Sequence, residues 1–389
     1  MDIASSQVIS TILRHDSKVT SYKIALLRAI NDVMLSFPDL GSYRQDVAVP
    51  LRLLAEYWVA YYWGFVALDQ PIAQGQRAQR DGGLRNDVEF RPALTEFRRQ
   101  WEEHTGGLSQ AADGFLVIHE LRIPRKLSTY PTALITAYQK TLTTIAKTIK
   151  MPIQYAGPGN WTIFEKPAAY RELSSRVVAV PGTEAQGVCL MITAELWQTF
   201  QAMSLWVEAL CIYEWCLFTE RVSQSHQPVS RGEIYNLLTD RPDNRRPLTW
   251  ENNQIEILLL EGQELRCPWT DKRIAQGTAY DLDHLLPLSV YPINEMWNLI
   301  PSDPSFNRHV KRDRLPNAEK LFAAQSSLEW DYERYGLSAT LSQALQEDVR
   351  LRFTTGRSVG RGVAAGVIVD RVVDLIEQIG RSRNLARFD

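Results

Sequence analysis

The stretch Tyr280-Asp-Leu-Asp-His-Leu-Leu-Pro-Leu-Ser289 is the most informative segment of this chain of 389 residues. Its apolar residues predict a β-strand, and Asp283 and His284 are adjacent on that strand. Adjacent residues of a strand point to opposite faces unless the strand end twists or bulges. The carboxylate and the imidazole can therefore serve one site from two directions.

A second polar segment follows in Asn307-Arg-His-Val-Lys-Arg-Asp-Arg-Leu-Pro316. It places the amide oxygen of Asn307 within a basic surround. A hard divalent cation such as Mg²⁺ binds few protein oxygens and keeps several waters or phosphates, so Asp283 and Asn307 suit it. An imidazole beside such an ion can take a proton from an attacking water. These groups are suited to phosphodiester hydrolysis.

These residues resemble the HNH, or ββα-metal, endonuclease family, and most closely the HNH domains of RNA-guided CRISPR nucleases and the resolvase-like members. The resemblance implies that His284 is the general base. It implies that Asp283 and Asn307 hold one Mg²⁺ or Mn²⁺ ion. It also places Asn298 in the catalytic set, as the residue that ties down the loop between the two strands without touching metal or substrate.

The resemblance extends to the flanking segments. Leu285-Leu-Pro287 matches the apolar step after the catalytic histidine. Trp297-Asn-Leu-Ile300 matches the second strand, and residues 306–312 match the helix. The basic segment is slightly longer than in the closest relatives, and His309 lies close enough to be an alternative metal ligand. The register of the second ligand is therefore open.

Cys267-Pro-Trp-Thr270 stands where many HNH relatives begin a zinc-binding pair of cysteines. Thr270 replaces the second cysteine, and no later pair follows, so no structural zinc is expected. Asn307 also stands where many relatives have a histidine. An oxygen site of this kind favours magnesium or manganese over zinc or nickel.

Basic side chains surround the predicted metal site. Taken alone they would be a solvated helix face, but cations beside a metal site favour a grip on phosphates. The net charge of the chain is −2, so any nucleic-acid affinity must come from local patches such as this one. The predicted phosphate-binding residues are Arg308, His309, Lys311, Arg312 and Arg314.

The chain as a whole has the composition of a globular protein, with 45% hydrophobic and 23% charged residues. Its patterns predict a mainly α fold with a small α+β module. We expect a helical N-terminal domain over residues 1–230, the HNH domain over residues 231–320, and a helical, Arg-rich segment over residues 321–389. Polar residues from Thr239 to Pro247 mark the passage into the nuclease.

Helical spacing of apolar residues predicts helices over residues 17–35 and from residue 49 onward. Short strands are expected over residues 115–123 and 176–180. The aromatic residues of the second helix could stack on nucleic-acid bases, but core packing is favoured because leucines continue the same buried pattern. These aromatic residues are Tyr57, Trp58, Tyr61, Tyr62 and Trp63.

The most apolar segment, residues 202–218, contains Glu208 and Glu214. It predicts a long, mostly buried helix over residues 193–222 and not a membrane span. The four cysteines show no framework spacing, and the N-terminus lacks the pattern of a secretory signal. We therefore expect a cytoplasmic protein that does not bind membranes.

The leading functional hypothesis is a metal-dependent DNA endonuclease. One metal and one base should cut one strand per engagement, which predicts a nickase. A stand-alone HNH module joined to a large helical domain suggests an effector in antiviral defence or restriction, with DNA and other proteins of a defence operon as partners. The architecture has a faint similarity to the nuclease effector of Zorya-type systems. The alternative hypothesis is a nucleic-acid-binding or regulatory component with an idle HNH module.

Overall fold

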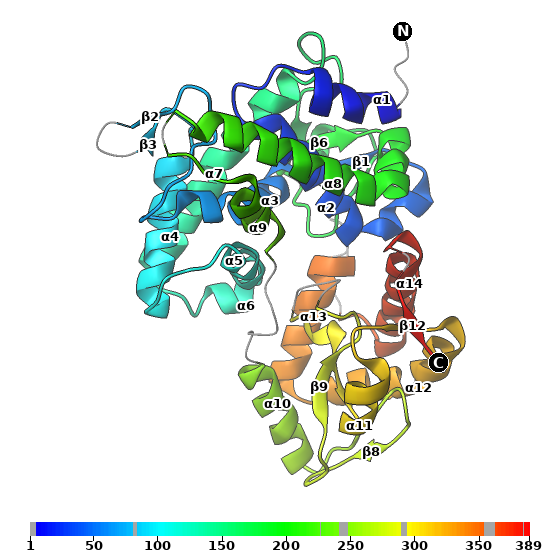
Figure 1. Cartoon of the computed structure of the whole chain (residues 1–389). Helices are drawn as coiled ribbons and strands as arrows, with labels where there is room; N and C mark the ends of the chain where they lie inside the picture. Colours follow the sequence, from blue (N-terminus) through cyan, green and yellow to red (C-terminus); the bar gives the residue numbers. More distant parts are fainter. Residues whose placement is uncertain are drawn as a thin grey trace. The chain divides into compact units, whose positions relative to one another are not determined.

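The computed structural model describes residues 5–80, 84–225, 227–240, 248–288, 294–353, 362–383 and 385–389. These residues form two compact units, Met1–Pro242 and Asp243–Asp389 (Figure 1). Both units are built mainly of helices with small sheets, which confirms the predicted fold class. The described residues leave out most of the predicted linker and Ser289 of the Asp-His segment. They also leave out Arg357 and Arg361 of the predicted Arg-rich segment.

The first unit is a set of helices around one core. Helices α2 (Tyr22–Ser36) and α3 (Leu51–Tyr62) form close to the positions that the apolar spacing predicts. Helix α2 packs on α8 (Ala194–Ser223), and α3 packs on α7 (Thr132–Gln154). The other helices of this unit are α1 (Ser5–Ser10), α4 (Arg91–Thr105), α5 (Asp113–Arg122), α6 (Pro124–Leu127) and α9 (Arg231–Thr239).

The aromatic side chains of α3 are buried in this core. Trp58 stacks on Tyr22 of α2 with 5.4 Å between ring centroids, and Tyr62 lies edge-on to Phe90 at 4.9 Å. Each member of the aromatic group predicted from the sequence is at most 5% exposed. Core packing is therefore confirmed, and these rings are not available to nucleic-acid bases.

A four-stranded sheet lies in the first unit, in the order β4-β6-β1-β5. Strand β1 (Val47–Pro50) pairs antiparallel with β6 (Val188–Ile192) and parallel with β5 (Val178–Ala179). The edge strand β4 is Ala168–Ala169. Strand β5 lies within the strand predicted over residues 176–180, which is confirmed.

The strand predicted over residues 115–123 is wrong, because this stretch belongs to α5. A short apolar run does not distinguish a strand from a buried helix. The helix is fitted closely against α3 at Gly114, where an added Cβ would lie 2.7 Å from the Cβ of Trp63. Tertiary contact with α3 accordingly selects the helix.

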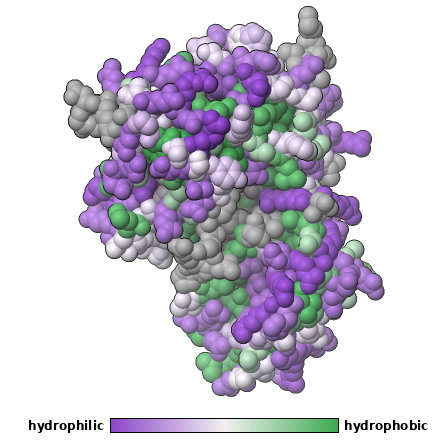
Figure 2. All heavy atoms as spheres, in the orientation of Figure 1, coloured by the Kyte–Doolittle hydropathy of each residue, from purple (hydrophilic) through white to green (hydrophobic). Residues whose placement is uncertain are grey.

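Helix α8 matches the long helix predicted over residues 193–222, but it is less buried than expected. Thr193 caps its start by accepting a hydrogen bond from the amide of Leu196. Leu205, Trp206 and Tyr213 are 62%, 74% and 47% exposed. Hydrophobic residues are visible among hydrophilic ones on the surface of this unit (Figure 2). In length and composition, α8 meets the requirements of a membrane span, which a core helix of a soluble protein can also meet.

The second unit contains a β-hairpin followed by a short helical segment. Strand β9 (Asp281–His284) pairs antiparallel with β10 (Leu299–Ser302), with Asp283 opposite Ile300. Helix α11 (Pro304–Phe306) then continues into one π-helical turn, η6 (Asn307–Lys311). This order gives the two strands and the helix that the sequence predicts. Two further small pairings are β7 (Leu265–Arg266) with β8 (Arg273–Ile274), and β11 (Leu315–Pro316) with β12 (Arg387–Phe388).

Four longer helices share one hydrophobic core with the hairpin. Tyr332 and Tyr335 donate hydrogen bonds to the carbonyl oxygens of Trp297 and Leu299, at 2.5 and 3.0 Å. Asp348 accepts a hydrogen bond from the amide of Met296 at 2.7 Å. The helices are α10 (Thr249–Leu260), α12 (Ala318–Tyr335), α13 (Ala339–Phe353) and α14 (Ala365–Arg383).

The structure therefore differs from the predicted division at residue 320. Residues 321–389 do not form a separate segment, because their helices complete the core of the second unit. The first unit also extends past residue 230, since α9 belongs to it. Arg352 of the Arg-rich segment is 1% exposed, so this part of the chain is not simply a basic tail.

Candidate active site

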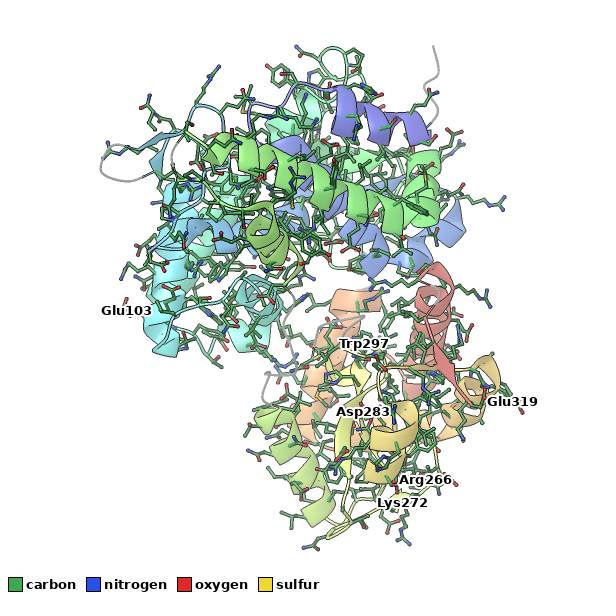
Figure 3. The ribbon with its side chains drawn as sticks, in the orientation of Figure 1. Glu103, Arg266, Lys272, Asp283, Trp297 and Glu319 are labelled. Carbon is green, nitrogen blue, oxygen red and sulfur yellow. The ribbon has the colours of Figure 1, made fainter. Side chains whose placement is uncertain are left out.

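Strand β9 and the turn η6 lie side by side in the second unit, and Figure 3 labels Asp283 on this strand. Asp281 and Asp283 are two residues apart, so their side chains share one face of β9. Asn307 donates a hydrogen bond from Nδ2 to Asp281 at 3.2 Å. The Nζ atom of Lys311 lies 2.9 Å from Oδ2 of Asp283. The structure thus brings the segments of both predicted metal ligands, Asp283 and Asn307, together.

Asp281 also binds Arg308. Its two carboxylate oxygens accept hydrogen bonds from Nε and Nη2 of Arg308, at 3.0 and 2.6 Å. These bonds raise the pKa of the Arg308 guanidinium. Asn307 makes the contact with Asp281 through Nδ2 of its side-chain amide. The side-chain oxygen, Oδ1, takes no part in this bond. That oxygen is the group that a hard cation would bind.

Lys311 is not a surface cation, in contrast to its predicted place among exposed phosphate-binding residues. Its side chain is 1% exposed, and that of Asp283 is 13% exposed. Asp283 Oδ2 has no partner with hydrogen-bond geometry, so the contact with Lys311 is an ion pair. This oxygen is buried and charged and lies against a cation. Asp283 therefore fits a divalent ion, which would share or replace the charge of Lys311.

His284 is 8% exposed, and its Nε2 lies 2.8 Å from Oδ1 of Asn294. A carbonyl oxygen can only accept, so Nε2 carries the proton of this bond. The neutral ring then has its lone pair on Nδ1. Asn294, which is 2% exposed, holds the ring through this bond, and the bond favours the tautomer with the proton on Nε2.

Asn298 closes the hairpin from within. Its Oδ1 accepts a hydrogen bond from the amide of Leu286 at 2.8 Å, and its Nδ2 donates to the carbonyl oxygen of Leu286 at 3.2 Å. Its own carbonyl oxygen accepts from the amide of Leu285 at 2.8 Å. Asn298 is fully buried, and these bonds tie the chain that follows His284 to the start of β10.

We expect Asn298→Ala to lower the free energy of unfolding by about 3 kcal/mol, because it leaves the buried amide and carbonyl of Leu286 without partners. Urea unfolding followed by tryptophan fluorescence measures this change. Asn253→Ala is the matched control, since Asn253 is exposed on α10 and its loss should cost less than about 0.5 kcal/mol. Equal stabilities of the two variants would contradict the anchoring role.

The remaining predicted phosphate-binding residues have different surroundings. Arg308, His309 and Arg312 are exposed, although Arg308 is paired with Asp281. Arg314 donates a hydrogen bond to the carbonyl oxygen of Val310 and is half-buried. Arg312 follows the end of η6 and has a φ of 51°, a positive value that residues other than glycine rarely adopt. Their contact with phosphate remains a prediction.

Sequence reasoning missed Asp281 and Asn294. The strand period of two could have found Asp281, because it stands two residues before Asp283 and must share its face. Asn294 offered no such signal, since its contact with His284 joins two residues that are ten positions apart in the sequence.

Cys267 is buried in the core of the second unit, at the turn between β7 and β8. Within the described ranges, no group of three or more His, Cys, Asp and Glu side chains is placed to hold a metal ion. The predicted ligands, Asp283 and Asn307, are a carboxylate and an amide, and both offer oxygen donors of the kind that magnesium or manganese prefers.

Comparison with known families divides the chain in the same way as its two units. Residues 3–238, more than half of the chain, match the model of a domain of unknown function (DUF8808). The chain belongs to the DUF8808 family. Residues 267–317 of this DUF8808 protein match the family model of an HNH endonuclease. No curated protein and no solved structure matches the chain.

The HNH match covers β9, β10 and η6, and with them Asp283, His284, Asn298 and Asn307. It supports the HNH domain that the sequence resemblance implied. An HNH domain in turn suggests that this DUF8808 protein is a metal-dependent nuclease acting on nucleic acid.

Proposed function

We propose that this DUF8808 protein is a DNA endonuclease with one active site, in which Asp283 and Asn307 hold one Mg²⁺ or Mn²⁺ ion and His284 is the general base. The observation that carries the proposal is the alignment of η6 along β9. It brings Asn307 to the strand that carries Asp283 and His284.

In this mechanism His284 takes the proton of the attacking water at Nδ1, because Asn294 holds the proton on Nε2. When bound, the divalent ion stabilises the charge that builds on the phosphate and the leaving oxygen. Asn298 acts through the backbone, by fixing the chain after His284. Arg308, His309 and Arg312 are the exposed groups that would contact the flanking phosphates.

One metal position and one base support cleavage of one strand per engagement, so we propose a nickase. The joining of an HNH domain to a large helical unit supports a role in antiviral defence or restriction, in the cytoplasm and with other proteins of a defence operon. The helical first unit would select the substrate or the partner.

One observation favours the alternative of an idle site that binds nucleic acid without cutting it. Lys311 already neutralises Asp283 at 2.9 Å, and a site with an internal cation does not depend on metal for its charge balance. An idle site predicts DNA binding that persists in EDTA and no turnover with any divalent ion.

A plasmid assay tests the proposal. We expect supercoiled DNA to become open-circular with Mg²⁺ or Mn²⁺ and to stay supercoiled with EDTA. Asn307→Ala should lower the rate by at least about 100-fold through loss of a metal ligand. Asn253→Ala, an exposed asparagine of α10, serves as the control and should cut at the parent rate. Full activity of Asn307→Ala would contradict the ligand assignment, and linear product at the earliest times would contradict the nickase.

A further inference from the structure

Asp281 is the point at which three donors of η6 meet strand β9. Its side chain is 21% exposed and receives Nδ2 of Asn307 at 3.2 Å. The guanidinium of Arg308 binds the same carboxylate through two nitrogens, at 3.0 and 2.6 Å. Neither the sequence motif nor the family match assigns this carboxylate a role.

The ion pair with Arg308 explains little by itself. Arg308 is 66% exposed, and an exposed ion pair adds little to stability because water and salt screen it. Two parallel hydrogen bonds do, however, fix the plane of the carboxylate. The Asp281 carboxylate is thereby held in the orientation in which it accepts the N–H of Asn307.

The contact between Asp281 and Asn307 determines which end of the Asn307 side-chain amide faces Asp281. An asparagine amide presents a donor at one end and an acceptor at the other. With Nδ2 bound to Asp281, Oδ1 is at the other end of the amide. Rotation of the amide would lose a charge-assisted hydrogen bond and bring its oxygen against a carboxylate, so Asp281 disfavours the rotated form.

We propose that Asp281 is a positioning residue of the active site, which selects the orientation of Asn307 that presents its carbonyl oxygen to the divalent ion. This inference rests on the proposed function, because it takes Asn307 as a metal ligand. Mutation of a residue that holds a metal ligand in place commonly weakens metal affinity by about tenfold or more. Arg308 assists by fixing the carboxylate of Asp281.

Binding of Mn²⁺, followed by electron paramagnetic resonance of the free ion, tests the inference without turnover. All variants carry His284→Ala, so that cleavage does not enter the measurement. We expect Asp281→Ala to weaken Mn²⁺ binding about tenfold. Asp281→Asn should recover part of the affinity, because its side-chain oxygen can still accept from Asn307. Thermal melts of each variant show whether the fold is intact.

Arg308→Ala is the matched comparison, since it removes the ion pair that assists Asp281 and keeps the carboxylate that accepts the N–H of Asn307. It should change Mn²⁺ affinity less than Asp281→Ala does. Equal losses in the two variants would assign the effect to the ion pair and overturn the inference. Unchanged affinity in Asp281→Ala would overturn it as well.

A double variant separates this inference from the proposed function. Adding Asp281→Ala to Asn307→Ala should weaken Mn²⁺ binding no further, because Asp281 acts through Asn307. If Asn307→Ala alone left the affinity unchanged, the metal-ligand assignment itself would fail. If Asn307→Ala weakened binding and Asp281→Ala did not, the proposed ligand would stand and the role of Asp281 would fall.

In the active protein, the same substitution should act on metal dependence. Asp281→Ala should raise the Mn²⁺ concentration for half-maximal nicking about tenfold, while the rate at saturating Mn²⁺ recovers. A purely structural defect would lower the rate at every metal concentration. This outcome would contradict a positioning role.

Discussion

His284→Ala should lower the rate of metal-dependent plasmid nicking by about 100-fold to 10,000-fold, which is the usual contribution of a general base. Alanine has no group that can take a proton from the attacking water. The rate is measured from the conversion of supercoiled to open-circular DNA under single-turnover conditions with Mg²⁺ or Mn²⁺. Cleavage by His284→Ala at the parent rate would exclude His284 as the base.

Two further variants make the loss interpretable. His15→Ala removes an exposed imidazole from the first unit and should cut like the parent protein. Asn294→Ala removes the same hydrogen bond as His284→Ala but keeps the imidazole. His284→Ala and Asn294→Ala both lose this buried hydrogen bond, which costs about 1–3 kcal/mol of stability. Asn294→Ala should lose less activity than His284→Ala, because it keeps the imidazole, and equal losses would show that removal of the imidazole is not what lowers the rate.

Lys311→Met should lower the free energy of unfolding of the metal-free protein by about 3 kcal/mol. The substitution removes the counter-charge of Asp283, whose side chain is only 13% exposed. Mn²⁺ should restore much of this stability, because a divalent ion bound to Asp283 supplies the missing positive charge and binds only the folded state. Urea unfolding in EDTA and in Mn²⁺ measures both effects.

The ion pair between Lys272 and Asp303 offers a matched comparison in the same unit. The Nζ atom of Lys272 lies 2.7 Å from Oδ2 of Asp303, but the Lys272 side chain is 45% exposed. Figure 3 labels Lys272 in the second unit. Lys272→Met should therefore cost less than about 1 kcal/mol, and Mn²⁺ should not restore it. A similar Mn²⁺ effect on both variants would contradict the idea that Lys311 stands close to the metal position.

The candidate site could be predicted largely because the HNH pattern is compact in sequence. Asp283, His284, Asn298 and Asn307 lie within one hairpin and the turn that follows it. Their types and order were enough to expect the arrangement. The burial of Lys311 could not be predicted. Which side of η6 faces β9 determines whether a basic side chain points to solvent or to a carboxylate, and the sequence does not specify this.

The fold was predictable where apolar residues recur at helical spacing, as in α2 and α3. The apolar run at residues 115–123 has no such pattern, and contact with α3 decided its structure. The membership of α12 and α13 in the nuclease unit also depends on contacts between distant residues. The hydroxyl of Tyr332 donates a hydrogen bond to the carbonyl oxygen of Trp297, 35 positions earlier in the sequence, and no local sequence pattern predicts that bond.

Because Tyr332, Tyr335 and Asp348 form hydrogen bonds to the hairpin, the HNH segment depends on helices that follow it in the chain. A gene fusion that transferred only the residues of the HNH match would leave the carbonyl oxygens of Trp297 and Leu299 without the tyrosine hydroxyls that bind them. Recombination would have to carry the chain through α13 at least. The same helices offer a point of control that is distant in sequence from Asp283 and His284. A protease or a binding protein that displaced α12 would remove hydrogen bonds that hold β10, the strand paired with β9.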